Sequence, residues 1–340
     1  MKLLSSNTED IEEAARAIKA GKLAAFPTET VYGLGGDAFN PLALAKIFEA
    51  KQRPRFDPLI VHIASIDGLK PLVDFSKIDE AVREKLDALI KVFWPGPLTF
   101  ILPKKPEVPD LATSGLLSVA VRFPDHPVAQ KLIELSSGAV AAPSANPFGY
   151  LSPTRAEHVA EQLGERVDYI IDGGAVRVGV ESTVLDMSGK EVRILRPGGL
   201  ARESIEEIIG AVELHRGEDH LPNSPGLLKS HYAPRTPLEL YSHEEMMKLD
   251  LHRGEAYVFF NRENSEIWRS KQSHNTEVII HILSEAGNLA EAAANLFSLL
   301  HKLDHDAFKA IHIERVPDEG LGLAINDRLF KARAQAKNSI

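Results

Sequence analysis

Apolar and polar positions alternate along the chain in patterns that predict short buried strands separated by amphipathic helices. Apolar residues recur at intervals of three and four over 10–20, 78–93 and 289–303, which predicts an amphipathic helix in each stretch. Short apolar runs bounded by turn-forming residues predict buried strands at 23–26, 59–63, 98–102, 139–142 and 169–172. This order of elements is typical of an α/β fold.

The pattern changes near residue 213 and resumes near residue 238. Over 213–237 the periodicity disappears, and a stretch of this length without elements is typical of a functional or disordered connection. Four further apolar runs, at 238–241, 256–260, 278–282 and 310–313, alternate with helical patterns and predict a small α/β unit with a mostly parallel sheet. We therefore expect a domain over 1–212, a linker over 213–237 and a second domain over 238–340.

The stretch after the first predicted strand contains several residues that could bind a ligand or an anion. The glycines within 33–36 predict a turn in which the backbone can approach a ligand or adopt positive φ. Asn40-Pro41 predicts a helix start, and the helix is expected to end near Lys51 because Pro54 prevents its continuation. Lys51 and Arg53 then lie at a helix C-terminus, where cations either complement the helix dipole or bind an anion.

Two later stretches give further local predictions. Over 118–123, Val119 and Val121 alternate with Ser118 and Arg122, so the two polar side chains are expected on the face away from the apolar set. Thr154-x-x-Glu157 predicts a capping box that opens a helix. Apolar runs over 182–186 and 192–196 flank Ser-Gly-Lys and predict a β-hairpin.

Length, charge and cysteine content narrow the class of protein. At 340 residues the chain exceeds the roughly 250–300 residues of most single cores, which favours two domains. The net charge of −9 argues against a surface that holds nucleic acid by counterion release. The absence of cysteine excludes disulfides and thiolate metal sites and fits a reducing, cytoplasmic setting. No apolar run reaches the roughly 18 residues of a membrane span.

Five ordered motifs carry a family resemblance: PTETVYGL from Pro27, KQRPRFDPL from Lys51, PSAN from Pro143, ESTVLD from Glu181 and SPGLLKSHYAP from Ser224. Together they resemble the Sua5/YrdC/YciO family, in its longer, two-domain Sua5 branch. The resemblance implies a YrdC-like twisted mixed sheet with flanking helices and a smaller C-terminal Rossmann-like α/β domain. It also implies L-threonylcarbamoyladenylate synthase activity, which joins threonine, bicarbonate and ATP and supplies the t6A modification of adenosine 37 in tRNAs that read ANN codons.

The same resemblance implies site roles at the matching positions. Catalytic cations are expected at Lys51 and Arg53. The residues expected to bind threonine are Thr30, His62, Arg122, Ala142 and Ser182. The residues expected to bind ATP are Arg53, Asp57, Ser118, Ser144, Asn146, Ser152, Arg196 and Tyr232. Ser118 and Asp57 stand where the family commonly has threonine and asparagine. The linker is expected to form a lid over the ATP site, which would exclude water from the adenylate.

The expected chemistry is positioning and charge neutralisation rather than covalent catalysis. Mg²⁺ is expected on the ATP phosphates, with no metal ligand from the protein. His62 is the nearest candidate for a general base, although a histidine at the end of a buried strand is more often simply packed. Proteins of the t6A machinery and weak tRNA contact are expected partners. The alternative function is a tRNA or double-stranded RNA binder without adenylate synthesis, which the acidic charge disfavours.

Overall fold

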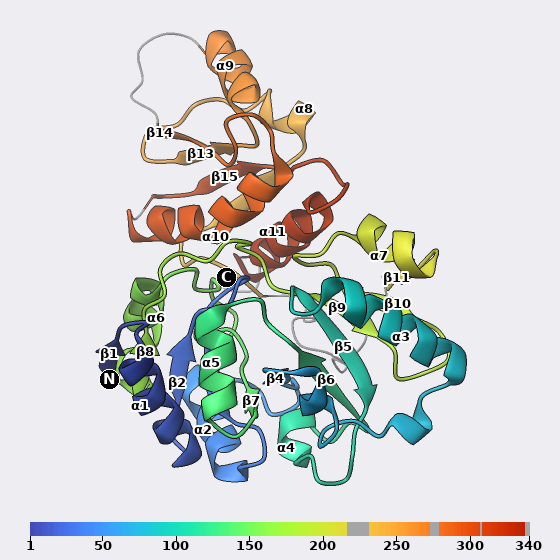
Figure 1. Ribbon diagram of the computed structural model, residues 1–340. Helices are drawn as coiled ribbons and strands as arrows, with labels where there is room; N and C mark the ends of the chain where they lie inside the picture. Colours follow the sequence, from blue (N-terminus) through green and yellow to red (C-terminus); the bar gives the residue numbers. More distant parts are fainter. Residues whose placement is uncertain (216–230, 273–278, 307, 337–340) are drawn as a thin grey trace. The chain divides into compact units, whose positions relative to one another are not determined.

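The computed structural model describes residues 1–215, 231–272, 279–306 and 308–336, which form two compact units (Figure 1). The N-terminal unit contains the described residues up to 215, apart from the tripeptides 149–151 and 178–180, which group with the C-terminal unit. Most of the predicted linker and lid, residues 216–230, lies outside the described residues. None of the described helices is long and apolar enough to cross a membrane.

The N-terminal unit is built on one 11-stranded mixed sheet with the strand order β1-β8-β2-β3-β7-β4-β6-β5-β9-β10-β11. Its strands are β1 Lys2–Leu4, β2 Ala24–Phe26, β3 Gly33–Asp37, β4 Ile60–Ile63, β5 Leu98–Pro103, β6 Ser118–Arg122, β7 Ala139–Ala141, β8 Tyr169–Ile171, β9 Thr183–Asp186, β10 Arg193–Arg196 and β11 Glu213–Leu214. Parallel pairs such as β4–β6 lie beside antiparallel pairs such as β5–β6, as the mixed-sheet prediction requires. The predicted hairpin is confirmed, because β9 and β10 pair antiparallel.

Helices cover both faces of this sheet. They are α1 Thr8–Lys19, α2 Pro41–Lys51, α3 Glu80–Phe93, α4 Asp110–Thr113, α5 Pro127–Leu135, α6 Ala156–Leu163 and α7 Arg202–Ile209. Short 3₁₀ turns lie at Ile66–Leu69, Phe75–Lys77 and Gly164–Arg166. Apolar residues of α1 and α5 form one core with one face of β2 and β7, whereas α2, α3 and α6 form the main core with the opposite face. Alternate side chains along each strand therefore pack into two separate cores, one on each face of the sheet.

Local sequence signals fix where several helices begin. The Asn40 side chain accepts hydrogen bonds from the backbone N–H groups of Leu42 and Ala43, and Pro41 occupies the first turn of α2, as predicted. The carboxylate of Asp79 caps α3 in the same way. Helix α2 ends at Lys51, and Gln52 follows with a φ of 54°, which turns the chain away from the helix axis. The cations after α2 are therefore carried by a loop that the helix positions.

The prediction of a glycine turn at 33–36 is wrong, because these residues form the central strand β3. Strand β3 pairs antiparallel with both β2 and β7. A Cβ atom on Gly35 would lie 2.7 Å from Phe26 Cε1 and 2.9 Å from Val140 Cγ1. The glycine is thus required by close packing of neighbouring side chains across the strand, rather than by a positive φ or a ligand.

The capping box predicted at Thr154 and Glu157 is also wrong. Helix α6 begins at Ala156 with Arg155 as its N-cap residue, and no side chain caps it there. Instead, the backbone N–H of Thr154 donates to Nδ1 of His158 at 3.3 Å. The histidine four residues later competes for the same group, which the S/T-x-x-E pattern cannot reveal.

The C-terminal unit contains a four-stranded sheet in the order β12-β15-β13-β14, and all of its pairs are parallel. Its elements are β12 Leu238–Tyr241, α8 His243–Met246, β13 Ala256–Phe259, α9 Arg262–Lys271, β14 Ile279–Ile282, α10 Leu289–His305, β15 Ile311–Glu314 and α11 Gly322–Ala336. The prediction of a smaller Rossmann-like α/β domain is confirmed. Buried aromatic residues dominate part of its core, where Trp268 stacks on Tyr257 with ring centroids 4.8 Å apart.

Candidate functional site

Three polar side chains lie in one row across the centre of the N-terminal sheet. His62 on β4 pairs with Arg122 on the parallel strand β6, and Arg122 pairs with Thr99 on the antiparallel strand β5. The flanking residues Val61 and Val121 belong to the main core. Because side chains alternate between the faces of a sheet, the polar row lies on the opposite face. The predicted direction of Arg122, away from the apolar set, is confirmed.

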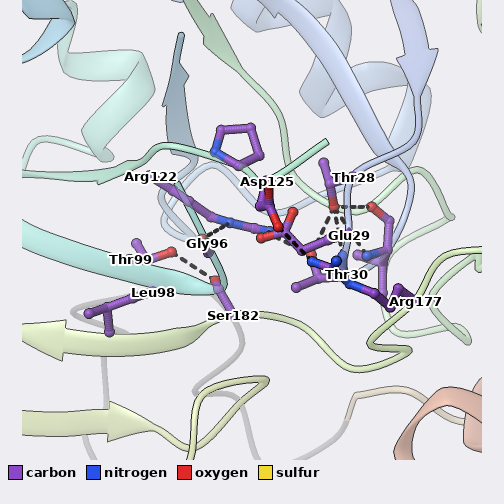
Figure 2. A network of polar contacts seen from close by, with 12 residues as sticks. Thr28, Glu29, Thr30, Gly96, Leu98, Thr99, Arg122, Asp125, Arg177 and Ser182 are labelled. Atoms are coloured by element: carbon purple, nitrogen blue, oxygen red, sulfur yellow. Dashed lines mark hydrogen bonds and ion pairs between the residues drawn. The ribbon is translucent and has the colours of Figure 1, made fainter. Parts of the chain in front are cut away.

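Arg122 is held by several partners although only 3% of its surface is exposed. Its Nη1 donates to the hydroxyl of Thr30 at 2.8 Å, and its Nε donates to the carbonyl oxygen of Gly96 at 3.3 Å. Its Nη2 lies 2.6 Å from Oε1 of Glu29 in a buried ion pair (Figure 2). The guanidinium plane is therefore fixed before any ligand arrives.

Glu29 is a residue that the sequence reasoning missed. Both of its carboxylate oxygens are buried, and neither makes a hydrogen bond to the described residues, although the ion pair with Arg122 is close. The available signal was an acid between two threonines shortly after the buried strand predicted at 23–26. The Thr28 hydroxyl donates to the carbonyl oxygen of Val31 at 2.7 Å, which folds this segment back and directs Glu29 toward Arg122 (Figure 2).

Ser182 joins this row to a second arginine. Its hydroxyl lies 2.7 Å from the hydroxyl of Thr99, and its carbonyl oxygen accepts from Nη2 of Arg196 at 2.9 Å. Ser182 directly precedes β9, and Arg196 ends β10, so the hairpin brings the two together. The structure thereby links two residues predicted to serve different substrates, with Ser182 assigned to threonine and Arg196 to ATP.

Lys51 is buried at the end of α2 and binds the chain at Ser144 and Asn146. Its Nζ donates to the carbonyl oxygens of both residues. Burial, followed by the charge of Arg53, holds the pKa of Lys51 well below its usual value. The lysine therefore positions the PSAN segment as well as supplying a candidate charge, and the sequence prediction did not include this first role.

Arg53 and Asp57 form a buried ion pair with 2.9 Å between Nη2 and Oδ2. Nε of Arg53 also donates to the carbonyl oxygen of Asp57, and Nη2 donates to that of Pro58. Burial raises the pKa of Asp57, while Arg53, Lys51 and Arg196 oppose that shift. All three cations are groups predicted to face phosphate, and Arg53 contacts the Asp57 carboxylate directly.

Other predicted residues are placed as follows. The backbone N–H of Ala142 donates to the carbonyl oxygen of Ile60, next to the row that contains His62. The hydroxyl of Ser152 donates to Oε1 of the buried Glu181. Ser118 is partly exposed at the start of β6. Glu181 was quoted within a motif but was not predicted as a site residue.

Two further predicted residues, His62 and Tyr232, are buried in different units. Burial, with a smaller contribution from Arg122, lowers the pKa of His62 to about 3, and its Nδ1 lies 3.2 Å from the carbonyl oxygen of Ile60. A base with so low a pKa accepts protons poorly near neutral pH. Tyr232 belongs to the C-terminal unit, where it is buried with a φ of 64° and its ring lies 5.7 Å from that of Phe297.

The described residues contain no group of three or more histidine, aspartate or glutamate side chains that could hold a metal ion. Mg²⁺ commonly keeps several waters and binds substrate phosphates with one or two carboxylates, so a dedicated protein cage is not required. Asp57 is a buried carboxylate paired with the candidate phosphate-binding cation Arg53. The donor set therefore fits an ion carried mainly by phosphate oxygens.

Comparisons with known proteins cover almost the whole chain. Residues 16–198 match the Sua5–YciO–YrdC family model, described as telomere recombination, and residues 200–334 match the model of the C-terminal domain of threonylcarbamoyl-AMP synthase. The threonylcarbamoyl-AMP synthase of Pyrococcus abyssi is 41% identical to this chain, over 98% of this chain and 98% of its own length. That of Bacillus subtilis is also 41% identical, over 97% of this chain and 94% of its own length. The crystal structure of P. abyssi Sua5 complexed with L-threonine is 39% identical, with a TM-score of 0.87 over 99% of this chain and 98% of that one.

Proposed function

The chain belongs to the Sua5–YciO–YrdC family, and on that premise we propose that it is an L-threonylcarbamoyladenylate synthase. The reaction joins L-threonine, bicarbonate and ATP to give threonylcarbamoyl-AMP and pyrophosphate. The product supplies the threonylcarbamoyl group for t6A at position 37 of tRNAs that read ANN codons. The observation that carries the proposal is the buried, pre-oriented Arg122. It is the cross-strand neighbour of Thr99, whose hydroxyl contacts that of Ser182, and the carbonyl oxygen of Ser182 accepts from Arg196.

The threonine side of the site is proposed to centre on Arg122. A planar guanidinium can bond both oxygens of a carboxylate, and here its orientation is already fixed by Thr30 and Glu29. His62, adjacent in the sheet, and Ala142 would shape the pocket for the rest of the amino acid. Ser182, one hydrogen bond from Thr99, would supply a hydroxyl to the same substrate.

The ATP side is proposed to use the cations around Asp57. Arg53 and Arg196 would exchange some of their contacts with the chain for phosphate oxygens, and the buried Lys51 would add charge and hold the PSAN segment. The other proposed ATP contacts come from Ser118, Ser144, Asn146, Ser152 and Tyr232. Mg²⁺, when bound to the triphosphate, would supply further charge neutralisation.

The proposed reaction has two steps. The unprotonated threonine amine attacks the carbon of bicarbonate, and loss of water gives a carbamate. A carbamate oxygen then attacks the α-phosphorus of ATP, the bond to the bridging oxygen breaks, and pyrophosphate leaves. The chain's contribution is to fix the two substrates and neutralise charge, since these residues offer positioning and electrostatic stabilisation rather than a nucleophile.

Pyrophosphate release with each substrate omitted in turn tests this proposal. Release should require threonine and bicarbonate together, and Lys51→Ala and Arg122→Ala should each reduce kcat/KM strongly. Threonine-independent turnover would reject the assignment. The tRNA-binding alternative predicts salt-sensitive tRNA affinity with no substrate-dependent release, and we propose tRNA and t6A-machinery contacts only as secondary interactions of this chain.

A further inference from the structure

The C-terminal unit contains a cavity of about 450 Å³ that the proposed reaction does not use. It is lined by residues that directly follow three neighbouring strands: Ser242 and His243 after β12, Phe260 and Asn261 after β13, and Arg315 and Val316 after β15. All of these residues belong to one compact unit. The cavity therefore lies at the carboxyl edge of the parallel sheet. Strands β13 and β15 are neighbours in this sheet (Figure 1).

The connections of this sheet diverge at the same edge. After β13 the chain continues through α9, which packs against β13 and β14, whereas after β15 it continues through α11, which packs against β12. Adjacent strands whose outgoing connections run in opposite directions leave a crevice between them. In open α/β sheets, ligands bind in the crevice outside the carboxyl ends of such strands.

The carboxylate of Glu314, which lies at the cavity, already has protein partners on both of its oxygens. Glu314 is buried, and its Oε1 lies 2.7 Å from Nδ1 of His243 and accepts from Nδ2 of Asn264 at 2.8 Å. Its Oε2 accepts from the backbone N–H of Phe260 at 2.9 Å. A carboxylate bound on both oxygens serves to orient its donors, as outer-shell carboxylates do at binding sites. It thereby fixes His243, whose side chain remains half exposed at the cavity.

Arg315 is oriented in a similar way. Its Nη2 donates to Oδ2 of Asp318 at 2.8 Å, and its guanidinium lies 4.9 Å from the ring centroid of Phe330. Oδ1 of Asp318 in turn accepts from the buried Asn326, which also binds the backbone of Val316. Among the described residues, Nε of Arg315 is buried without a hydrogen-bond partner, while the side chain as a whole is 35% exposed. The loop after β15 thus holds an oriented arginine whose side chain remains partly accessible.

The combination of these groups points to an oxyanion. Both acidic side chains are occupied, while Arg315, His243 and the N-terminus of the ten-residue helix α9 offer positive charge or donors to the cavity. Phe260 and Val316 add apolar surface beside them.

We propose that this cavity binds a small organic molecule in which one carboxylate or phosphate monoester is attached to an apolar body. The oxyanion would lie against Arg315 and His243, and the apolar body would lie against Phe260 and Val316. None of the residues that line this cavity is among those proposed to bind threonine or ATP, and all of them belong to the C-terminal unit.

Benzoate and phenyl phosphate, titrated into the full chain, distinguish the two oxyanions. Backbone amide NMR shifts should move at Phe260 and Asn264 with one or both probes, and benzyl alcohol, which lacks the charge, should bind at least about tenfold more weakly. Arg315→Gln and His243→Gln should each weaken binding about fivefold or more. Arg269→Gln is the matched control, because it removes one exposed cation from α9 outside the cavity and should leave affinity unchanged.

The titration is repeated in Arg53→Ala, which removes a proposed ATP contact from the N-terminal unit. Shifts at Phe260 should persist there, so the outcome does not depend on whether the chain makes threonylcarbamoyl-AMP. The proposal is overturned if neither probe changes the amide shifts of Phe260 and Asn264. The probe concentrations for this test run from a 20-fold molar excess to roughly 20 mM. It is also overturned if benzyl alcohol binds equally well, or if Arg269→Gln weakens binding as much as Arg315→Gln.

Discussion

Nη2 of Arg122 lies 2.6 Å from Oε1 of Glu29, and the two side chains are 4% and 1% exposed. The arginine comes from β6 at the centre of the sheet, and the glutamate comes from the loop after β2, 93 positions earlier in the chain (122 − 29). A buried ion pair of this kind is costly to break, because the remaining charge has no water to solvate it. Glu29 therefore connects the stability of the site to the orientation of its central cation.

Replacing Glu29 by glutamine should separate these two effects. Glu29→Gln leaves the Arg122 charge buried without its counter-ion, and we expect a loss of about 3 kcal/mol in the unfolding free energy of the N-terminal unit. The KM for threonine should rise about tenfold, because the guanidinium loses one of its fixed contacts. Urea unfolding, followed by pulsed hydrogen exchange in peptides from β4 and β6, gives the first quantity, and steady-state kinetics give the second.

The matched control for this substitution is Asp125→Asn. Asp125 pairs with Arg177 at the same distance of 2.6 Å, but the side chains are 45% and 71% exposed (Figure 2). An exposed ion pair contributes at most about 1 kcal/mol to the unfolding free energy. The control should therefore change both the unfolding free energy and the KM for threonine very little. Equal losses in the two variants would show that burial of the Glu29 pair has no special effect.

Gly35→Ala should destabilise the N-terminal unit although alanine is a small residue. Its Cβ would meet Phe26 and Val140 at less than 3.0 Å, so side chains in the core beneath α1 and α5 would have to shift. Overpacking of this kind costs about 1–3 kcal/mol of unfolding free energy. Gly189→Ala is the control, because nothing lies within 4 Å of its Cβ position. If both variants unfold at the same urea concentration, the packing explanation for the β3 glycines fails.

The buried His62 predicts a specific loss of stability in mild acid. Its folded-state pKa of about 3 lies below the ordinary value of 6.5, so the unfolded chain binds a proton first as pH falls. The stability is fully present above pH 6.5 and declines as pH falls toward 3, by about 2 kcal/mol between pH 6.5 and pH 5. The unfolding free energies of wild type and His62→Leu should be measured across this range. Their slopes against pH should differ by the amount that corresponds to about one proton taken up on unfolding.

The exposed His252 provides the comparison for that slope. The substitution His252→Gln, which removes an exposed histidine, is the matched control for the His62 variant. A His62→Leu slope identical to that of wild type would mean that His62 accepts its proton in the folded state as readily as in the unfolded chain.

Lys51→Met should reduce activity by removing a donor from two carbonyl oxygens. The PSAN segment would lose the contacts at Ser144 and Asn146, and the site would lose a cation, so we expect kcat/KM to fall about 100-fold or more. Lys46→Met is the control on the same helix, because its Nζ binds the carbonyl oxygen of Gly21 away from the site. Pyrophosphate release measures both, and comparable losses would locate the effect in α2 rather than in Lys51.

The sequence predicted local elements well where local chemistry decides them. Asn40 and Pro41 start α2 whatever the rest of the chain does, and the alternation around Arg122 places it off the core face. It failed at Gly35, where side chains from two other strands lie close, and at Thr154, where His158 accepts the hydrogen bond expected for Glu157. A glycine selected by contact with Phe26 and Val140 looks the same in sequence as one selected for a turn.

The sequence by itself determined the elements, the two-domain α/β class and the identity of the candidate cations, because these depend on short-range periodicity, capping and residue type. The tertiary structure decided which charges meet: the sheet order brings β6 to the segment after β2, and the hairpin carries Arg196 to Ser182. Burial then decided the electrostatics of these charges. Loss of water lowers the pKa of Lys51, and it leaves the buried Arg122 dependent on Glu29 as its counter-ion. Distances and solvation arise only when distant segments pack, so no local pattern can encode them.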